Sequence, residues 1–313
     1  MSTGTVPKKA WSSKRGFTST EEKILSAFGE LQVPYFTAED MTRLRFQKGS
    51  KAFVRRVMTE LAGGGDNINH YLLRFGLPYA PGNFERYFAL GSRGRDYLRT
   101  LGLDMHWWQR RRNYSFNTLL HDSFVIKALV ALHLFVGQYP DYQLVETKTA
   151  FALAKNPPRF TFSPSEAVQE TINVIPDIWA CLERAHGDTP EVFAMWIEVD
   201  CGTETREKFQ RLLINRINLI RTKKYAEFFN IHSITFCYLV GTPTRDQRLV
   251  RLRRLREWTA DVLAEMSLDD WSPLFRFSTI DEYLYDSLIL FTDPVFCTPD
   301  SDTLISLFST PQL

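Results

Sequence analysis

Residues 195–209 read MWIEVDCGTETREKF, and the change of pattern within this stretch decides the fold of the larger part of the chain. Its first part is apolar and of strand length, whereas its second part is charged and opens a long helical pattern. Gly202 separates the two parts and favours a turn. The stretch therefore predicts a buried strand that leads through a tight turn into a helix.

The turn has a purely structural interpretation. Gly202 would form the turn, Thr203 would cap the next helix, and Glu204 would interact favourably with the positive N-terminal end of that helix. On this interpretation the three residues are needed without any chemistry.

Two carboxylates stand at the end of the predicted strand. Alternate side chains of a strand share a face, so Glu198 and Asp200 lie side by side there. Asp177 belongs to the preceding apolar run, 172–183, in which Pro176 ends or bends a central strand. If the two strands are neighbours, the three carboxylates converge and offer the oxygen ligands that Mg²⁺ or Mn²⁺ prefers. Acidic residues are also common at the ends of surface strands, so both interpretations stay open.

The pattern from residue 119 onwards alternates between helix and strand. A mostly buried helix at 119–137 opens the order αβββαβαβ, which predicts an α/β domain with a mixed central sheet over 119–280, in a chain that is α+β overall. His121 and Asp122 in the first helix can add a ligand or an acid to the site, although a histidine at a helix end is usually structural. We expect residues 281–313 to pack on this domain as a C-terminal extension, with docking of a partner as the alternative.

Length, composition and charge indicate a globular chain with two different halves. The 313 residues suffice for two domains, and 44% are hydrophobic. Residues 1–112 carry 19 Lys and Arg against 10 Asp and Glu, a net charge of +9, whereas 113–313 carry 19 against 26, a net charge of −7. No apolar run has the length of roughly 18 to 20 residues that a membrane span needs, and the N-terminus has no signal-peptide core. We therefore expect a cytoplasmic protein without a membrane partner, and the four cysteines, which form no CxxC pair, to be reduced thiols.

The basic half predicts a winged helix-turn-helix over residues 18–104, between a flexible basic arm at 1–17 and a linker at 105–118. Ser19 with Glu22 and Thr37 with Asp40 have the spacing of helix-capping boxes. Helices are expected at 19–31, 37–46, 50–62 and 92–102, and β-like runs at 70–75 and 85–90.

The third predicted helix has an apolar and a basic face. Phe53 is expected to join the apolar face with Val54 and Val57. We expect the basic side to contact the phosphates of double-stranded DNA, with a solvated face as the alternative. The candidate DNA-binding residues are Lys48, Lys51, Arg55, Arg56, Arg74 and Arg86. A second basic helix, 247–266, is expected to expose Arg248, Arg251, Arg253, Arg254 and Arg256 to DNA or to solvent.

The strings VIPDIWACLE, WIEVDCGTET and ITFCYLVGTPTR, followed by the arginine-rich helix, resemble the replication-relaxation family of plasmids and other mobile elements. The resemblance covers residues 18–262. It implies an N-terminal winged helix joined to a domain that resembles PD-(D/E)XK nucleases, and DNA handling in replication, DNA relaxation or mobilisation. By this resemblance Asp177 and Glu198 would hold the metal ion, and Asp200 stands where the lysine of the nuclease motif would be.

The missing lysine puts catalysis in doubt. In the nuclease chemistry the lysine neutralises charge that develops beside the scissile phosphate, which an aspartate cannot do. Some related nucleases take this cation from the following helix, where Arg211 is the first candidate and Lys208 the second, while Leu212 holds the expected position. A nuclease-like fold that only binds is the alternative.

Three functions follow from the sequence. The first is a DNA-binding protein of a mobile element that cleaves DNA with Mg²⁺ or Mn²⁺. The second is a non-catalytic accessory factor or transcription regulator, whose acidic half recruits a partner such as a replication, relaxase or transposition protein. The third is a protein-interaction adaptor, which the net charge of −7 over residues 113–313 favours because an acidic surface repels DNA.

Overall fold

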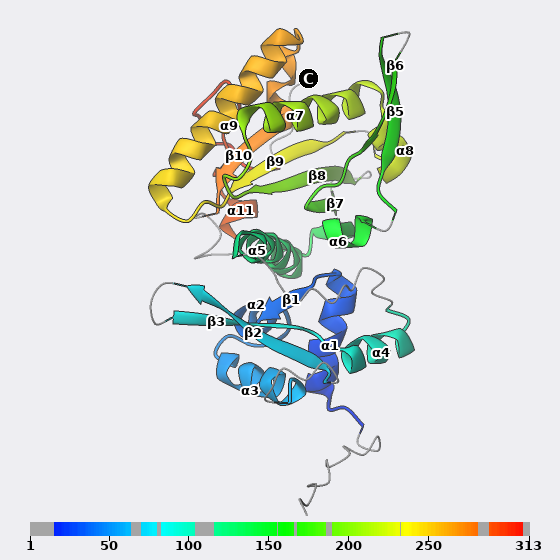
Figure 1. The fold of residues 1–313 in the computed structure, drawn as a ribbon, viewed down its shortest axis with the longest axis vertical. Coiled ribbons are helices and arrows are strands. Elements are labelled where there is room, and N and C mark those ends of the chain that lie inside the picture. The colour runs from blue at the N-terminus through cyan, green and yellow to red at the C-terminus, as the bar shows by residue number, and fades with distance from the viewer. Residues whose placement is uncertain are drawn as a thin grey trace, which may run out of the picture.

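The computed structural model describes residues 16–63, 70–79, 83–103, 116–154, 156–165, 168–185, 190–231, 233–280 and 288–308. We call residues 16–103 the N-terminal part and residues 116–308 the C-terminal part. Together they form a mixed α/β structure, shown in Figure 1. The described residues do not include positions 1–15 of the predicted arm (1–17) or positions 105–115 of the predicted linker (105–118).

The N-terminal part joins helices to a small antiparallel sheet. Its strands β1, β2 and β3 are arranged in the order β1-β3-β2, so that the hairpin β2–β3 adds to a short strand that the sequence analysis missed. The elements are α1 (Ser19–Leu31), β1 (Tyr35–Thr37), α2 (Ala38–Arg45), α3 (Lys51–Leu61), β2 (Leu72–Tyr79), β3 (Asn83–Leu90) and α4 (Ser92–Thr100).

Side-chain caps fix where the first helices begin. Thr37 and Asp40 form the predicted capping box at α2. The box at α1 is formed by Thr18 and Glu21, one residue earlier than predicted, because Ser19 already has helical backbone geometry.

The buried face of the third helix differs from the predicted one at Phe53. α3 buries Val54, Val57, Met58 and Leu61, but Phe53 is 43% exposed. The expectation that Phe53 belongs to the apolar face is therefore wrong, because the residue lies about a quarter turn from the centre of the buried face.

The C-terminal part is built on a mixed sheet of five strands, as predicted. The strand order is β10-β9-β8-β7-β4, with β8, β9 and β10 parallel and β7 and β4 antiparallel to their neighbours. Helices connect the parallel strands, as such pairs require. The elements are α5 (Phe116–Gln138), β4 (Tyr142–Thr149), α6 (Ala150–Leu153), β5 (Arg159–Ser165), β6 (Val168–Asn173), β7 (Ile178–Arg184), β8 (Glu191–Asp200), α7 (Arg206–Arg221), α8 (Lys224–Phe229), β9 (Thr235–Val240), α9 (Arg245–Glu265), η1 (Asp269–Leu274), β10 (Phe275–Thr279) and α11 (Ile289–Thr292).

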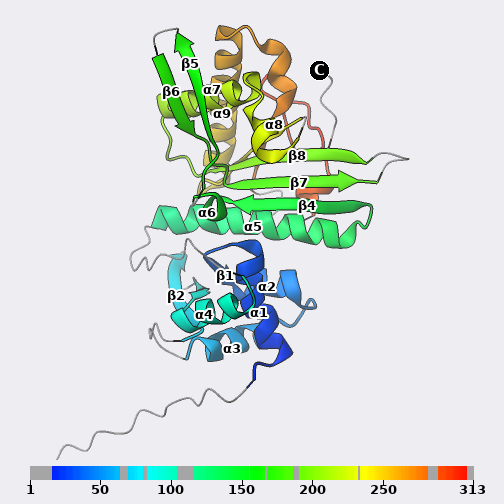
Figure 2. The same ribbon diagram turned by 90° about the vertical axis from the view of Figure 1, so that its right-hand side faces the viewer.

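The hairpin β5–β6 is the main element that the sequence analysis missed in this part. The apolar run at 172–183 is divided near Pro176, which was expected to end or bend the strand, since β6 ends at Asn173 and β7 begins at Ile178. Pro176 lies in the connection, where its missing N–H costs no ladder bond. The hairpin stands apart from the central sheet, as Figure 2 shows.

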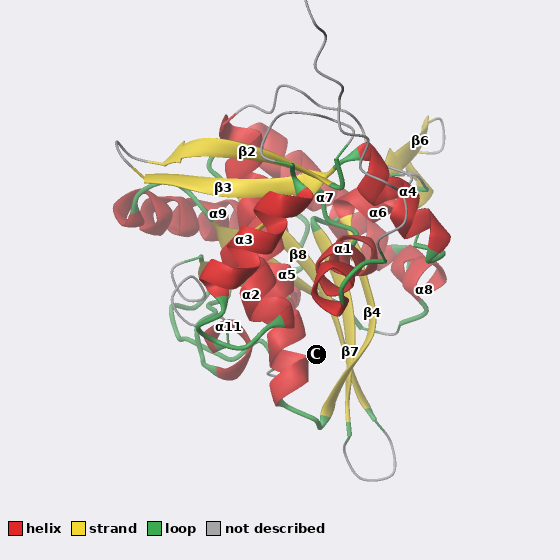
Figure 3. Ribbon diagram, turned by 90° about the horizontal axis from the view of Figure 1, so that it is seen from below, coloured by secondary structure: helices red, strands yellow, loops and turns green. Residues whose placement is uncertain are grey.

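The sheet separates two apolar cores. The first lies between the sheet and α7 and α9 and includes Trp179, Trp196 and Leu255. The second joins the N-terminal part to α5 and to the opposite face of the sheet. It includes Phe28 of α1 and Ile197 of β8. Figures 1 and 3 show the N-terminal helices on this α5 side.

Hydrogen bonds and an ion pair also join the two parts across α5. The hydroxyl of Tyr35 donates to the carbonyl of Leu119 at 3.0 Å. Lys127 Nζ lies 3.2 Å from Oδ1 of Asp40, which belongs to the capping box of α2. A shared core and buried polar contacts fix the orientation of the N-terminal part on the C-terminal part.

Residues 288–308 pack on the rest of the C-terminal part. Phe277 and Cys297 form an isolated antiparallel bridge, and the rings of Phe291 and Phe308 each lie 5.3 Å from that of Phe135 in α5. All four cysteines are free thiols. The expectation that no apolar run is long enough to span a membrane is wrong for the described residues, since the stretch 117–138 is long and apolar enough. It is mostly buried, however, as is usual for the core helix of a soluble protein.

Candidate functional site

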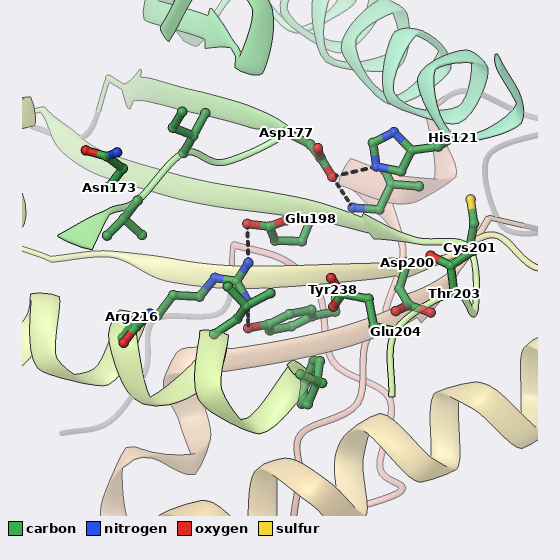
Figure 4. Close-up of a pocket in the computed structure, with 16 residues that line it drawn as sticks. His121, Asn173, Asp177, Glu198, Asp200, Cys201, Thr203, Glu204, Arg216 and Tyr238 are labelled. Atoms are coloured by element: carbon green, nitrogen blue, oxygen red, sulfur yellow. Dashed lines mark hydrogen bonds and ion pairs between the residues drawn. The ribbon is translucent and has the colours of Figure 1, made fainter. Parts of the chain in front are cut away.

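A cavity of about 380 Å³ opens where β8 ends, between the connection that precedes β7 and the helix α7. The three predicted acids, Asp177, Glu198 and Asp200, all line it. Figure 4 shows them together with His121 from α5 and Arg216 from α7. The expectation that their two strands are neighbours is confirmed, since β7 and β8 pair directly.

Asp177 precedes β7 and is held from two sides. Ile178 pairs with Ile197, which places Asp177 beside Glu198. Oδ2 of Asp177 accepts a hydrogen bond from the backbone N–H of Val199 at 2.8 Å and lies 3.1 Å from Nε2 of His121. The other oxygen, Oδ1, has no hydrogen bond within the part of the chain that the structure describes.

His121 bridges two carboxylates. Its Nδ1 lies 3.2 Å from Asp122 Oδ1, while its Nε2 faces Asp177. Burial favours the neutral ring, but attraction to Asp177 and the hydrogen bonds to both carboxylates outweigh burial and raise the pKa of His121 to about 11. A protonated ring donates from both nitrogens, which is the arrangement that two carboxylate partners require.

Glu198 is paired with a cation that the sequence analysis did not identify. Its Oε1 accepts hydrogen bonds from Trp196 Nε1 and from Arg216 Nη2, both at 2.6 Å. Burial raises the pKa of Glu198 to about 7 despite the attraction of Arg216, and the negative charge of Asp177 acts in the same direction as burial. The carboxyl group therefore changes its charge near neutral pH.

Arg216 joins α7 to the sheet beneath the cavity. Nη1 donates to the hydroxyl of Tyr238 at 3.0 Å, and the guanidinium lies 5.5 Å from the centre of that ring. Arg216 is 7% exposed, and its Nε has no hydrogen-bond partner among the described residues. Arg216 follows Phe209 by seven residues, about two helical turns, so the two side chains share one face of α7. Because Phe209 is buried, this spacing could have predicted that Arg216 is buried as well.

The two predicted cations, Lys208 and Arg211, are exposed and are not among the side chains that line the cavity. Lys208 pairs with Glu204 at 2.9 Å. Leu212 lines the cavity, so the position expected for a lysine does face the site but carries no charge. The geometry therefore does not support a catalytic role for Lys208 or Arg211.

Asp200 is engaged in a buried ion pair. Its Oδ1 and Oδ2 accept hydrogen bonds from Nε and Nη2 of Arg251 at 2.8 and 2.7 Å, and its Oδ1 also accepts from the backbone N–H of Gly202 at 2.8 Å. Arg251 is 7% exposed, so the prediction that α9 exposes it is wrong. With both oxygens bonded, Asp200 stabilises the end of β8 rather than offering a free ligand.

The turn after β8 is largely as expected. Gly202 has a φ of +78°, which favours glycine. The residue that caps α7 is Thr205, whose hydroxyl accepts from the N–H of Lys208, and not Thr203, because the helix begins at Arg206. Thr203 and Glu204 instead line the cavity.

Metal binding rests on two residues in this geometry. Asp177 and Glu198 each keep one carboxylate oxygen without a hydrogen bond from the described residues. No group of three or more His, Cys, Asp or Glu side chains is placed to hold a metal ion in the described part of the chain. A bound divalent cation would therefore need water or phosphate oxygens to complete its shell.

The candidate DNA-binding residues cluster around α3. Lys48, in the turn before the helix, and Arg55 are exposed. Lys51 pairs with Glu39, and the guanidinium of Arg56 lies over the ring of Phe53. On the hairpin, Arg86 is exposed and Arg74 is half-buried. Figures 1 and 2 show that α3 lies on the side of the N-terminal part that faces away from α5.

The second basic helix is less basic on its surface than its sequence indicates. Arg248 donates to the carbonyl of Thr242, and Arg256 donates to the carbonyl of Thr298. With Arg251 buried, Arg253 and Arg254 are the exposed members of the predicted set.

Comparisons of the chain with protein-family models, with curated proteins and with solved structures gave no significant match. The resemblance of the sequence motifs to the replication-relaxation family stays a prediction.

Proposed function

We propose that the chain is a DNA-binding protein of a plasmid or other mobile element, acting in replication, DNA relaxation or mobilisation. Its N-terminal part would be a winged helix-turn-helix that binds double-stranded DNA through α3, and its C-terminal part a nuclease-like fold. The observation that carries the proposal is the basic surface of α3, whose exposed side faces away from the rest of the protein.

The dimensions and charges of α3 suit a major groove. Its eleven residues span roughly 16 Å, and a groove about 12 Å wide admits a helix. Exposed cations at Lys48, Arg55 and Arg56 surround its outer side. The strands β2 and β3 bring Arg74 and Arg86 as additional phosphate contacts, as a wing would.

Salt dependence of DNA binding tests this assignment. Fluorescence anisotropy with a labelled duplex, measured over a series of NaCl concentrations, compares the wild type with an Arg55→Ala, Arg56→Ala variant. Loss of two phosphate contacts should reduce the slope of log K against log salt by about 2. The matched control, Arg253→Ala with Arg254→Ala, removes the same charge from α9 and should leave the slope unchanged. Equal effects of both pairs, or no DNA binding by the wild type, would contradict the proposal.

The ion pairs in the cavity favour a non-catalytic role for the C-terminal part. Each acid already has a cationic partner, namely His121 for Asp177, Arg216 for Glu198 and Arg251 for Asp200. A site neutralised in this way attracts a metal ion weakly. The C-terminal part would then recruit a replication, relaxase or transposition protein while α3 holds the DNA.

Metal-dependent DNA cleavage is the second candidate function. The adjacent positions of Asp177 and Glu198 in one cavity favour it, since two carboxylates with Mg²⁺ or Mn²⁺ can activate water and stabilise charge on a phosphate. Arg216 would be the cation nearest to the acids, in place of the predicted Arg211 or Lys208.

A cleavage assay separates the two candidates. Supercoiled, linear and single-stranded DNA are incubated with the protein and Mg²⁺, Mn²⁺ or EDTA, beside Asp177→Asn and Glu198→Gln variants. Nicking that needs metal and disappears in both variants would establish the nuclease. Binding without cleavage in all three proteins would leave the accessory role.

A further inference from the structure

Phe53 is an exposed aromatic side chain on the candidate recognition helix. It is 43% exposed at the start of α3, whereas Val54, Val57 and Met58 beside it are buried. The guanidinium of Arg56, one turn later, lies 5.4 Å from the centre of its ring. A phenylalanine gains stability by leaving water, so its position on this surface is suited to contact with another molecule.

The charges around Phe53 indicate what that molecule is. Four exposed cations lie within five residues of Phe53 in the sequence, namely Lys48, Lys51, Arg55 and Arg56, and they outnumber the two carboxylates that pair with Lys51 and Arg56, those of Glu39 and Glu60. A second copy of the same surface would bring like charges together, whereas an anionic surface matches it. Among anionic partners, the major groove of DNA combines phosphates on both sides with an apolar group inside, the 5-methyl group of thymine.

We propose that Phe53 is a specificity-determining residue that selects thymine by packing its ring against the 5-methyl group in the major groove. This inference rests on the proposed function, because it requires that α3 enters the groove. The contact with Arg56 is consistent with this role, since a cation over the ring holds the side chain at the surface, where Phe53 remains 43% exposed for contact with the methyl group. Thymine alone among the four bases presents a methyl group there.

Uracil substitution tests the contact at the level of one methyl group. Sites enriched from a random duplex library are resynthesised with deoxyuridine in place of each thymidine in turn, and binding is measured for the wild type and for Phe53→Ala. Loss of a buried methyl group should weaken wild-type binding about fourfold at one position. Phe53→Ala should bind the thymine and uracil sites equally at that position. Phe53→Leu should keep part of the wild-type difference between the two sites.

The control variant is Leu249→Ala, which removes an apolar side chain of similar exposure, 48%, from α9. It should show the wild-type response to uracil. Equal binding of thymine and uracil sites by the wild type would overturn the proposal while leaving DNA binding intact. Absence of any DNA binding would instead contradict the proposed function itself. A change of oligomeric state in Phe53→Ala, measured by light scattering, with an unchanged uracil response would assign Phe53 to a protein interface and also overturn the proposal.

Discussion

Asp200 at the end of β8 and Arg251 in α9 form a bidentate ion pair that is buried on both sides, with side-chain exposures of 7% and 8%. The pair ties the turn at Gly202 to the helix that covers the sheet. The partner of Asp200 comes from a helix 51 residues later in the chain, so the pair also connects two distant segments.

Removing one partner of this pair should destabilise the protein strongly. Arg251→Met leaves a buried carboxylate without its cation, and we expect the free energy of unfolding in urea to fall by about 3 to 5 kcal/mol. Arg206→Met serves as control, because its ion pair with Asp261 is half-exposed on both sides and should contribute less than about 1 kcal/mol. Equal losses in the two variants would show that the Asp200 pair is not the stabilising contact.

The local signals in the sequence predicted more of the fold than of the site. The pattern around Gly202 predicted the strand, the turn and the helix, because each depends on neighbouring residues. Hairpin β5–β6 was missed, since only Ile172 and Asn173 of it belong to the apolar run at 172–183, which divides at Pro176. The spacing from Phe209 could have placed Arg216 inside, but not the acid that it meets. Arg216 and Arg251 reach Glu198 and Asp200 through the packing of α7 and α9 on the sheet.

Two histidines in α5 should differ in charge at pH 8, with His121 cationic and His133 neutral. Burial lowers the pKa of His133 to about 4, with Arg45 acting in the same direction, whereas the two carboxylates raise that of His121 to about 11 against the effect of burial. Nitrogen NMR of the imidazoles should therefore find His121 protonated on both nitrogens and His133 on one, from pH 5 to pH 9.

The charge of His121 also links pH to stability. Because its pKa is higher in the folded than in the unfolded protein, its contribution is complete below pH 6.5 and is lost as pH rises from 6.5 towards 11. In His121→Gln this loss should be absent from the pH profile of urea unfolding. A wild-type His121 that titrates near pH 6.5 would contradict both expectations.

Glu198 should make the free energy of unfolding depend on pH in a separate, lower pH range. Its pKa is raised from 4.5 to about 7 by burial, so the stability that its neutral form provides is present below pH 4.5 and is lost as pH rises through 7. Relative to Glu198→Gln, the wild type should lose up to about 3 kcal/mol over this range. A carboxyl carbon resonance with a midpoint near pH 7, absent from the variant, would identify the group. A midpoint near 4.5 would instead show that the attraction of Arg216 fully offsets the effect of burial on the pKa of Glu198.

The shared core predicts that the two parts of the chain unfold together. Phe28 in α1 and Ile197 in β8 belong to one apolar cluster, although they lie on opposite sides of α5. Phe28→Ala should therefore lower the protection against hydrogen exchange not only in α1 and α2 but also in β8. The expected loss is about 3 to 5 kcal/mol, as for other buried phenylalanines.

Phe209→Ala is the matched variant on the other side of the sheet, since Phe209 is equally buried in the second cluster. If the protein is one cooperative unit, Phe209→Ala should lower the protection against hydrogen exchange in α2 as much as in β8. Exchange of the most protected amides then requires global unfolding. Loss of protection confined to the N-terminal part in Phe28→Ala would instead mean that α5 separates two independently stable units. The orientation of α3 relative to the cavity would then be free to change when DNA binds.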